Sequence, residues 1–133
     1  MPKRNRSGYL LISAAVRATA SLLGAPRAMT DRLVFLHGFT QTHHHWHECA
    51  HLIASRLPVT PTQAFLDLPG HGLSPDDPST IEDAAPLLGS AGGRGTYVAY
   101  SMGGRFALAA LALRPPEIER LVVIGSTAGI VDP

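Results

Sequence analysis

Residues 98–106 read Val98-Ala99-Tyr100-Ser101-Met102-Gly103-Gly104-Arg105-Phe106, and they join an apolar run to a helical pattern with only Ser101 between them. A sharp strand-to-helix turn of this kind raises a serine hydroxyl above the edge of a sheet, and it needs small residues nearby. Ala99 and Gly103 lie two positions either side of Ser101. Gly103 allows close backbone packing, whereas Ala99 stands where glycine is usual but is still small. The segment therefore predicts a buried strand, a tight turn and a helix.

Ser101 has two interpretations, as a catalytic nucleophile or as the N-cap of the helix that follows it. The serine ends an apolar run and has small neighbours on both sides, which favours the nucleophile. The N-terminus of the following helix also directs free N–H groups toward this position and favours negative charge there. We therefore predict that Ser101 is a nucleophile.

The rest of the chain alternates between short apolar runs and helical patterns. The runs predict strands at residues 33–36, 64–66, 97–100 and 121–124, and the helical patterns lie at 46–56, 81–88 and 102–113. The runs are continuously apolar, as expected for strands covered on both faces. The order of elements predicts an α/β fold with a parallel sheet and helices on both faces.

Some details of the helices and connections are also predicted. Pro86 is expected to disrupt the second helix. The third helix is expected to present one apolar stripe, made of Phe106, Ala109, Ala110 and Leu113. The glycine-rich residues 89–95 lack the spacing of a phosphate-binding loop and are interpreted as a surface connection.

The loop after the first strand carries the sequence Leu36-His37-Gly38-Phe39-Thr40. When a nucleophile stands on a strand-to-helix turn, an N–H from such a loop completes the oxyanion hole. The N–H groups of Phe39 and Met102 are the candidates, although a simple strand-ending turn stays possible. We predict that His37 is structural, and that His71 belongs to a rigid turn on the wrong connection to act as a base.

Three motifs carry a family resemblance. They are His37-Gly38-Phe39-Thr40-Gln41 with Trp46, Asp67-Leu68-Pro69-Gly70-His71-Gly72, and Tyr100-Ser101-Met102-Gly103-Gly104-Arg105. Together they resemble the α/β-hydrolase superfamily over about residues 32–132. The first two motifs are common among hydrolases. The third, joined to residues 126–130, more narrowly resembles the 2-succinyl-6-hydroxy-2,4-cyclohexadiene-1-carboxylate synthases of menaquinone biosynthesis.

The resemblance implies a lyase in which a Ser-His-Asp triad removes a proton from the substrate and pyruvate leaves. It implies that Ser101 is the triad serine and that Phe39 and Met102 supply the oxyanion N–H groups. It also implies that Arg105 binds the carboxylate of a small-molecule substrate, with Tyr100 and Gly38 as further substrate-binding residues. Arg105 lies one helical turn beyond Ser101, which suits this role, but a solvated helix residue is the alternative. No cofactor or metal is implied. A serine esterase or a carbon–carbon hydrolase of the same fold stays open.

The rest of the triad is not evident in the sequence. In this fold the order is serine, acid and then histidine, but no histidine follows Ser101, and the only later acids are Glu117, Glu119 and Asp132. We therefore expect a truncated α/β-hydrolase fold, with negligible activity alone and an unpaired edge at residues 121–124. An inactive fragment or interaction domain is the alternative.

A metal enzyme is a further alternative. His47-Glu48-Cys49-Ala50-His51 matches the H-E-x-x-H pattern on a predicted helix, and residues 43–45 are also histidines. No third ligand is evident at the spacing of the longer form of that motif. We interpret the segment as an exposed, histidine-rich helix start and predict no metal site.

Composition limits the classes of partner. The chain has 133 residues, 45% of them hydrophobic, and a net charge of +1. It lacks the basic face that nucleic-acid binding requires and the apolar length that crosses a bilayer. With one cysteine it forms no internal disulfide, which fits a reducing compartment. The net charge predicts that the chain does not associate with membranes. The composition does not indicate which oligomeric state the chain adopts.

Residues 1–30 differ from the remainder. Lys3, Arg4 and Arg6 precede an apolar run at 8–16, in the outline of a secretory signal. The alternative is that translation starts at Met29 and the preceding residues are spurious. We favour the spurious extension, with residues 31–133 as the N-terminal half of a cytoplasmic enzyme domain.

Overall fold

A computed structural model describes residues 31–129 of the chain. The expectation for residues 1–30 therefore lies outside the described residues. In chain order the elements are β1 (Arg32–Leu36), η1 (His43–Trp46), α2 (His47–Ser55), β2 (Thr62–Leu66), α3 (Ile81–Gly92), β3 (Gly95–Tyr100), α4 (Met102–Ala112) and β4 (Ile118–Ile124).

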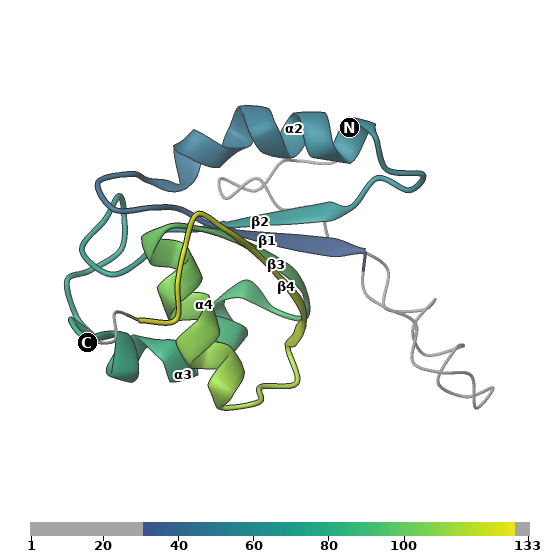
Figure 1. Ribbon diagram of the computed structural model, residues 1–133. Helices are drawn as coiled ribbons and strands as arrows, with labels where there is room; N and C mark the ends of the chain where they lie inside the picture. The colour runs from purple at the N-terminus through teal and green to yellow at the C-terminus, as the bar shows by residue number, and fades with distance from the viewer. Residues whose placement is uncertain (1–30, 130–133) are drawn as a thin grey trace.

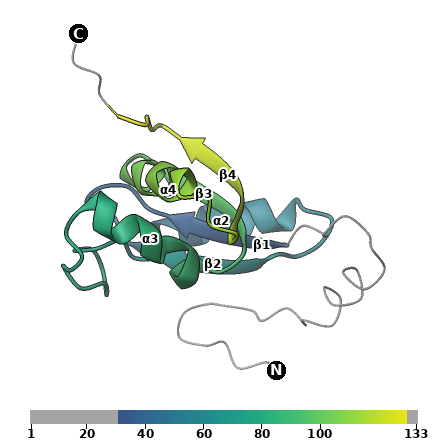
Figure 2. The ribbon, with the colours of Figure 1, turned by 90° about the horizontal axis from the view of Figure 1, so that it is seen from below.

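The four described strands form one parallel sheet in the order β2-β1-β3-β4. Helix α2 covers one face, and α3 and α4 cover the other (Figures 1 and 2). The predicted α/β class with helices on both faces is confirmed. Leu36 pairs with Leu66 of β2 and with Ala99 of β3, so the strands end at a common edge. The loops that follow the strands therefore meet at that edge, where open α/β sheets bind their ligands.

The core has one apolar layer on each face of the sheet. Because successive side chains of a strand point to opposite faces, Val34 and Leu36 pack under α3 and α4, while Phe35 packs with Trp46 and Ala50 of η1 and α2. All three β1 side chains are fully buried. The prediction that all four strands are covered on both faces is confirmed for β1, whereas it is wrong for β4, where Val122 and Ile124 are exposed at the edge of the described sheet.

The prediction that Pro86 disrupts the second helix is wrong. Helix α3 continues through Pro86 to Gly92, and the Thr80 hydroxyl caps its start by accepting a 3.1 Å hydrogen bond from the Asp83 N–H. Proline costs a helix one internal hydrogen bond, but Pro86 lies on the exposed side of the helix. The buried side of α3, made of Ala84, Ala85 and Leu88, anchors the helix.

The interpretation of residues 89–95 as a surface connection is also wrong. Gly89 and Gly92 are buried in the last turn of α3. A Cβ at Gly92 would lie 2.5 Å from Tyr97 Oη. That hydroxyl donates a 2.8 Å hydrogen bond to the Gly93 carbonyl. The glycines are therefore places where α3 closes onto β3, rather than residues of a solvated loop.

The C-terminal part of the described chain is more open than its pattern suggests. Helix α4 ends at Ala112, and Leu113 is 58% exposed, so its predicted place in the apolar stripe is wrong, and Ala107 is buried instead. Within residues 31–129, β4 is an edge strand whose Val122 and Ile124 are 45% and 44% exposed, as predicted for an unpaired edge. None of the helices in this range has the length and apolarity needed to cross a membrane.

Candidate active site

Ser101 stands alone between β3 and α4, as the sequence predicts. Its backbone has φ 49° and ψ −115°, a conformation that residues with a side chain rarely adopt. Such strain costs about 1–3 kcal/mol and persists only where the surrounding structure enforces it. The Ser101 N–H donates a 2.9 Å hydrogen bond to the Ile124 carbonyl at the end of β4, which holds the turn in place.

The turn is tight because α4 begins directly against the end of β1. A Cβ at Gly103 would lie 2.6 Å from the His37 carbonyl oxygen and 2.8 Å from that of Leu36. No side chain fits at that distance, so the predicted need for glycine here is confirmed. Ala99 is fully buried, so its single methyl group is accommodated two residues before Ser101.

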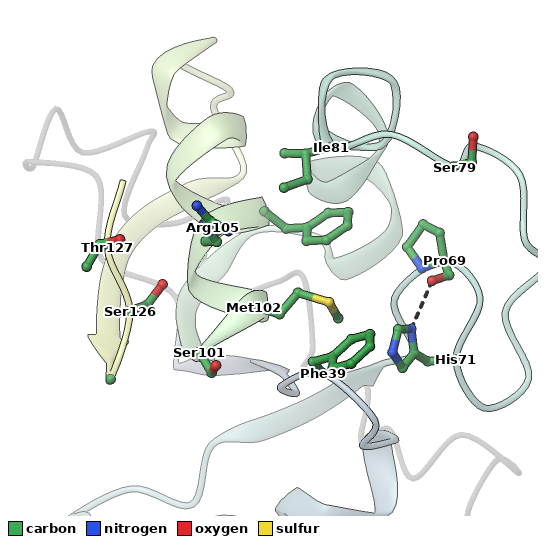
Figure 3. Close-up of a pocket in the computed structure, with 12 residues that line it drawn as sticks. Phe39, Pro69, His71, Ser79, Ile81, Ser101, Met102, Arg105, Ser126 and Thr127 are labelled. Atoms are coloured by element: carbon green, nitrogen blue, oxygen red, sulfur yellow. Dashed lines mark hydrogen bonds between the residues drawn. The ribbon is translucent and has the colours of Figure 1, made fainter. Parts of the chain in front are cut away.

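The loop after β1 brings Phe39 to the same edge of the sheet as Ser101 (Figure 3). Gln41 holds this loop: its side-chain oxygen accepts a 2.9 Å hydrogen bond from the Gly38 N–H, and its N–H donates to the Gly38 carbonyl. The N–H of Met102, at the first position of α4, has no acceptor within the helix. Within residues 31–129 neither this N–H nor that of Phe39 donates to a protein acceptor, so both are available to a ligand.

Ser101 opens into a cleft of about 680 Å³. Its wall is made by the loops that follow the strands and by the first turns of α3 and α4 (Figure 3). Arg105 of α4 lines it and is exposed, without an ion pair or hydrogen bond to any residue within 31–129. Ser126, after β4, also lines it, and its Oγ is buried without a partner among the described residues. The cleft therefore brings together the Ser101 hydroxyl, the Arg105 guanidinium and the Ser126 hydroxyl, and the last two have no partner among the described residues.

The structure places Gly38 and Tyr100 beside the cleft rather than in its lining. Gly38 is buried, and a Cβ there would lie 2.9 Å from the Tyr100 ring. Tyr100 is 41% exposed at the end of β3. Their contact packs the loop that carries Phe39 against the strand that carries Ser101, and their role in substrate binding stays a prediction.

His37 is fully buried at the base of the Phe39 loop. Its Nδ1–H donates a 2.8 Å hydrogen bond to the Gly38 carbonyl, and its Nε2 accepts a 3.0 Å hydrogen bond from the Leu68 N–H. The ring thus joins the loops after β1 and β2, which supports the structural role predicted for it. Burial, reinforced by the nearby His71, lowers the pKa of His37 despite the opposing hydrogen bond to Gly38.

We expect acid to destabilise the fold through His37. Above pH 6.5 the ring is neutral in both the folded and unfolded chains; below it the unfolded chain takes up a proton that folded His37 resists. The free energy of unfolding should therefore fall as the pH drops below 6.5, by up to about 1.4 kcal/mol per pH unit for this one proton. Urea unfolding at a series of pH values measures the slope. His37→Gln should flatten it, whereas the exposed control His51→Gln should not; equal slopes in both variants would contradict the assignment.

His71 lies in the cleft wall, which the sequence pattern did not indicate. It faces Phe39, and its ring bridges two loops: Nδ1–H donates a 2.9 Å hydrogen bond to the Pro69 carbonyl (Figure 3), and Nε2 accepts a 3.3 Å hydrogen bond from the Thr40 N–H. Because both ring nitrogens take part in hydrogen bonds, the His71 ring is fixed in the wall of the cleft. The signal that could have placed His71 in the cleft is its position after a strand, because parallel strands all end at the same edge of the sheet.

The H-E-x-x-H alternative gains no third ligand. Among the described residues, one group of three potential ligands includes His47 but not His51, and it does not line the Ser101 cleft. Glu48 is exposed. Partial burial, with repulsion from His44 and His43, lowers the pKa of His47. The pair His47 and His51 therefore lacks the ligand set of a catalytic zinc site.

Comparison with known proteins agrees with this architecture. Residues 33–133 match the model of the alpha/beta hydrolase family. The chain is 34% identical over 108 residues to the 2-succinyl-6-hydroxy-2,4-cyclohexadiene-1-carboxylate synthase of Enterobacter sp. (strain 638), covering 75% of this chain and 39% of that protein. It is 37% identical over 99 residues to the lipase LipV of Mycobacterium tuberculosis, covering 70% and 36%.

Among solved structures, MenH from S. aureus superposes with a TM-score of 0.60 and 28% identity, over 79% of this chain and 41% of that one. The chain thus spans well under half the length of each of these relatives.

Proposed function

Because the chain belongs to the alpha/beta hydrolase family, we propose that Ser101 is the catalytic serine of an enzyme that acts on a small carboxylate substrate. The observation that carries the proposal is the backbone of Ser101, strained at φ 49° on the turn between β3 and α4. The strained backbone is explained if it presents the Ser101 hydroxyl to a substrate in the cleft. A serine that only capped α4 would adopt an ordinary extended backbone, and its side chain would bond the helix, which Ser101 does not do.

The free N–H groups of Phe39 and Met102 complete the proposal. Both stand at the edge where Ser101 emerges, and two such donors stabilise an oxygen that gains negative charge in the transition state. That oxygen is a tetrahedral oxyanion in ester hydrolysis and an enolate in proton abstraction beside a carbonyl. The donors therefore serve both reactions, and the substrate must be inferred from other residues.

Arg105 favours an acidic substrate. It lies in the cleft one helical turn after Ser101 and has no partner within residues 31–129, so its guanidinium is free to bind a carboxylate with two hydrogen bonds. We therefore propose as first candidate a 2-succinyl-6-hydroxy-2,4-cyclohexadiene-1-carboxylate synthase, the activity named for the relative that is 34% identical, with pyruvate as the leaving group that the resemblance implies. The second candidate is an ester hydrolase, which the similarity to the lipase LipV supports.

A comparison of two substrates tests the choice. The full-length protein is incubated with the succinyl-cyclohexene precursor of menaquinone and, separately, with p-nitrophenyl esters, and pyruvate and p-nitrophenol are measured. Release of pyruvate at a kcat/KM well above that for the esters supports the synthase. Turnover of esters with no release of pyruvate overturns the synthase in favour of the esterase.

Replacement of Arg105 separates the same two candidates. Loss of a hydrogen-bonded charge typically costs about 1.5–3 kcal/mol, so we expect Arg105→Met to lower kcat/KM for the acidic substrate roughly 10- to 100-fold, while turnover of a neutral ester changes little. Steady-state kinetics on both substrates measures the effect. Arg56→Met, which changes an exposed arginine at the end of α2, is the control. An equal loss on acid and ester would show that Arg105 does not recognise the carboxylate.

A further inference from the structure

Three histidines gather at the start of the first helical segment, on the side of the molecule away from α3 and α4. His43 and His44 belong to η1, and His47 begins α2 one turn later, which places the three rings on one side of the segment. One ring nitrogen from each lies within 4.8 Å of the others. The centroids of the His43 and His44 rings are 3.9 Å apart, and those of His44 and His47 are 5.1 Å apart.

Two of these three rings, those of His44 and His47, are exposed to solvent and form no hydrogen bond or ion pair with the part of the chain that the structure describes. The His47 ring packs at a steep angle, 67° between the ring planes, against the Phe65 ring of β2, with a centroid distance of 4.6 Å. Clustered imidazoles repel one another once protonated, whereas in the neutral form their free lone pairs can share one metal cation.

The third ring is oriented by a carboxylate. His43 Nδ1 lies 2.7 Å from Asp67 Oδ2, and the His43 N–H donates a 2.7 Å hydrogen bond to Asp67 Oδ1. The Asp67 side chain is 8% exposed and follows β2 directly. Because a carboxylate accepts this bond, Nδ1 carries the hydrogen and Nε2 keeps its lone pair. A carboxylate that orients an imidazole in this way is the usual partner of a metal-bound histidine.

We propose that His43, His44 and His47 bind one transition-metal ion of the Zn²⁺ class, with Asp67 as the positioning residue of His43. Three imidazole nitrogens suit Zn²⁺, Ni²⁺ or Cu²⁺, whereas Mg²⁺ and Ca²⁺ prefer oxygen ligands. Zinc–nitrogen bonds of about 2.0–2.1 Å require the ring nitrogens to approach more closely than in the free site, and rotation of the exposed His44 and His47 side chains provides that approach.

The site is separate from the cleft of Ser101. None of its three ligands lines that cleft, so the ion would act on the structure rather than on the substrate. His43 reaches Asp67 at the end of β2, while η1 follows the loop that carries Phe39. A bound ion would therefore fix η1 and α2 against β2 and limit the movement of the Phe39 loop. Because the site forms only in the folded chain, binding would stabilise the fold.

Zinc titration of the full-length protein, prepared without a histidine tag, tests the proposal. Isothermal titration calorimetry should give one ion per chain, and Zn²⁺ should raise the unfolding temperature. His44→Ala and His47→Ala, both at exposed positions, should each weaken binding at least about tenfold. The matched control is His51→Ala, which removes an exposed histidine one turn further along α2 and should bind as the unmodified chain does.

Asp67→Asn tests the positioning residue. It should weaken Zn²⁺ binding about 10- to 100-fold under conditions in which circular dichroism shows that the fold is retained. A purely structural Asp67 would leave the affinity of the folded protein unchanged. If this variant does not fold, the Zn²⁺ affinities of the His44 and His47 variants, which change exposed residues, still test the metal site. Equal affinity in the His44, His47 and His51 variants, or no binding by the unmodified chain at micromolar Zn²⁺, would overturn the proposal.

Discussion

Ser101→Ala is expected to abolish turnover by the full-length protein, with kcat falling by about 10⁴-fold or more. Removal of the nucleophile of a serine-based triad leaves only substrate binding and oxyanion stabilisation, and the triad residues act as a unit, so the loss is large. The strained backbone at φ 49° should remain, because it is imposed by the Ile124 carbonyl and by the contact between Gly103 and β1 rather than by the hydroxyl. Steady-state assays with the preferred substrate, together with a circular dichroism spectrum, measure both properties.

Two comparisons make the Ser101 result decisive. Ser79→Ala removes another serine that lines the same cleft but whose side chain points away from Ser101 (Figure 3), and it should keep nearly full activity. A fluorophosphonate probe should label Ser101 in the unmodified enzyme and leave the Ser101 variant unlabelled. Retention of more than a tenth of the activity in Ser101→Ala would remove this serine from the reaction and leave the N-cap as its role.

The strand-to-helix turn at Ser101 was predictable because its signal is local. Ser101 stands between an apolar run and a helical pattern, and Gly103 follows at the position where the chain must approach β1; each feature is visible within a few residues. The parallel sheet was predictable for a related reason, since alternating strands and helices allow few other arrangements. Strand starts were less visible. β2 begins at the polar Thr62 and β4 includes Glu119 and Arg120, because backbone pairing in an outer strand does not require an apolar side chain.

Features that depend on partners distant in sequence were not predictable. The glycines at the end of α3 resemble a flexible loop until Tyr97 is placed against Gly92. The place of His71 in the cleft wall was not predictable, because nothing near it in sequence indicates that Thr40 lies opposite its ring. The same limit applies to the histidines of η1. The H-E-x-x-H pattern draws attention to His51, whereas the carboxylate that orients His43 comes from the end of β2, a strand that follows α2.

The largest expected effect on stability comes from Gly103→Ala. The added methyl group would lie 2.6 Å from the His37 carbonyl oxygen and 2.8 Å from that of Leu36. Both are backbone atoms at the buried end of β1, so neither moves aside as a flexible side chain would. Overpacking of this kind typically costs about 1–3 kcal/mol and sometimes more, and we expect the upper part of that range. Relief requires α4 to shift away from β1, which would also turn Ser101 away from Phe39 and lower activity.

Equilibrium urea unfolding of the full-length protein measures the loss, and Gly129→Ala is its control, because a Cβ at Gly129 meets no atom of residues 31–129 within 4 Å. The same substitution should therefore be nearly neutral at residue 129 and severe at residue 103. Activity separates the two consequences of the clash: if α4 shifts as a unit, kcat falls even in the fraction that remains folded, whereas simple destabilisation lowers only the amount of folded enzyme. A Gly103→Ala variant as stable and active as the unmodified protein would mean that α4 does not press on β1. The close contact of α4 with β1 could then no longer explain the strained backbone of Ser101.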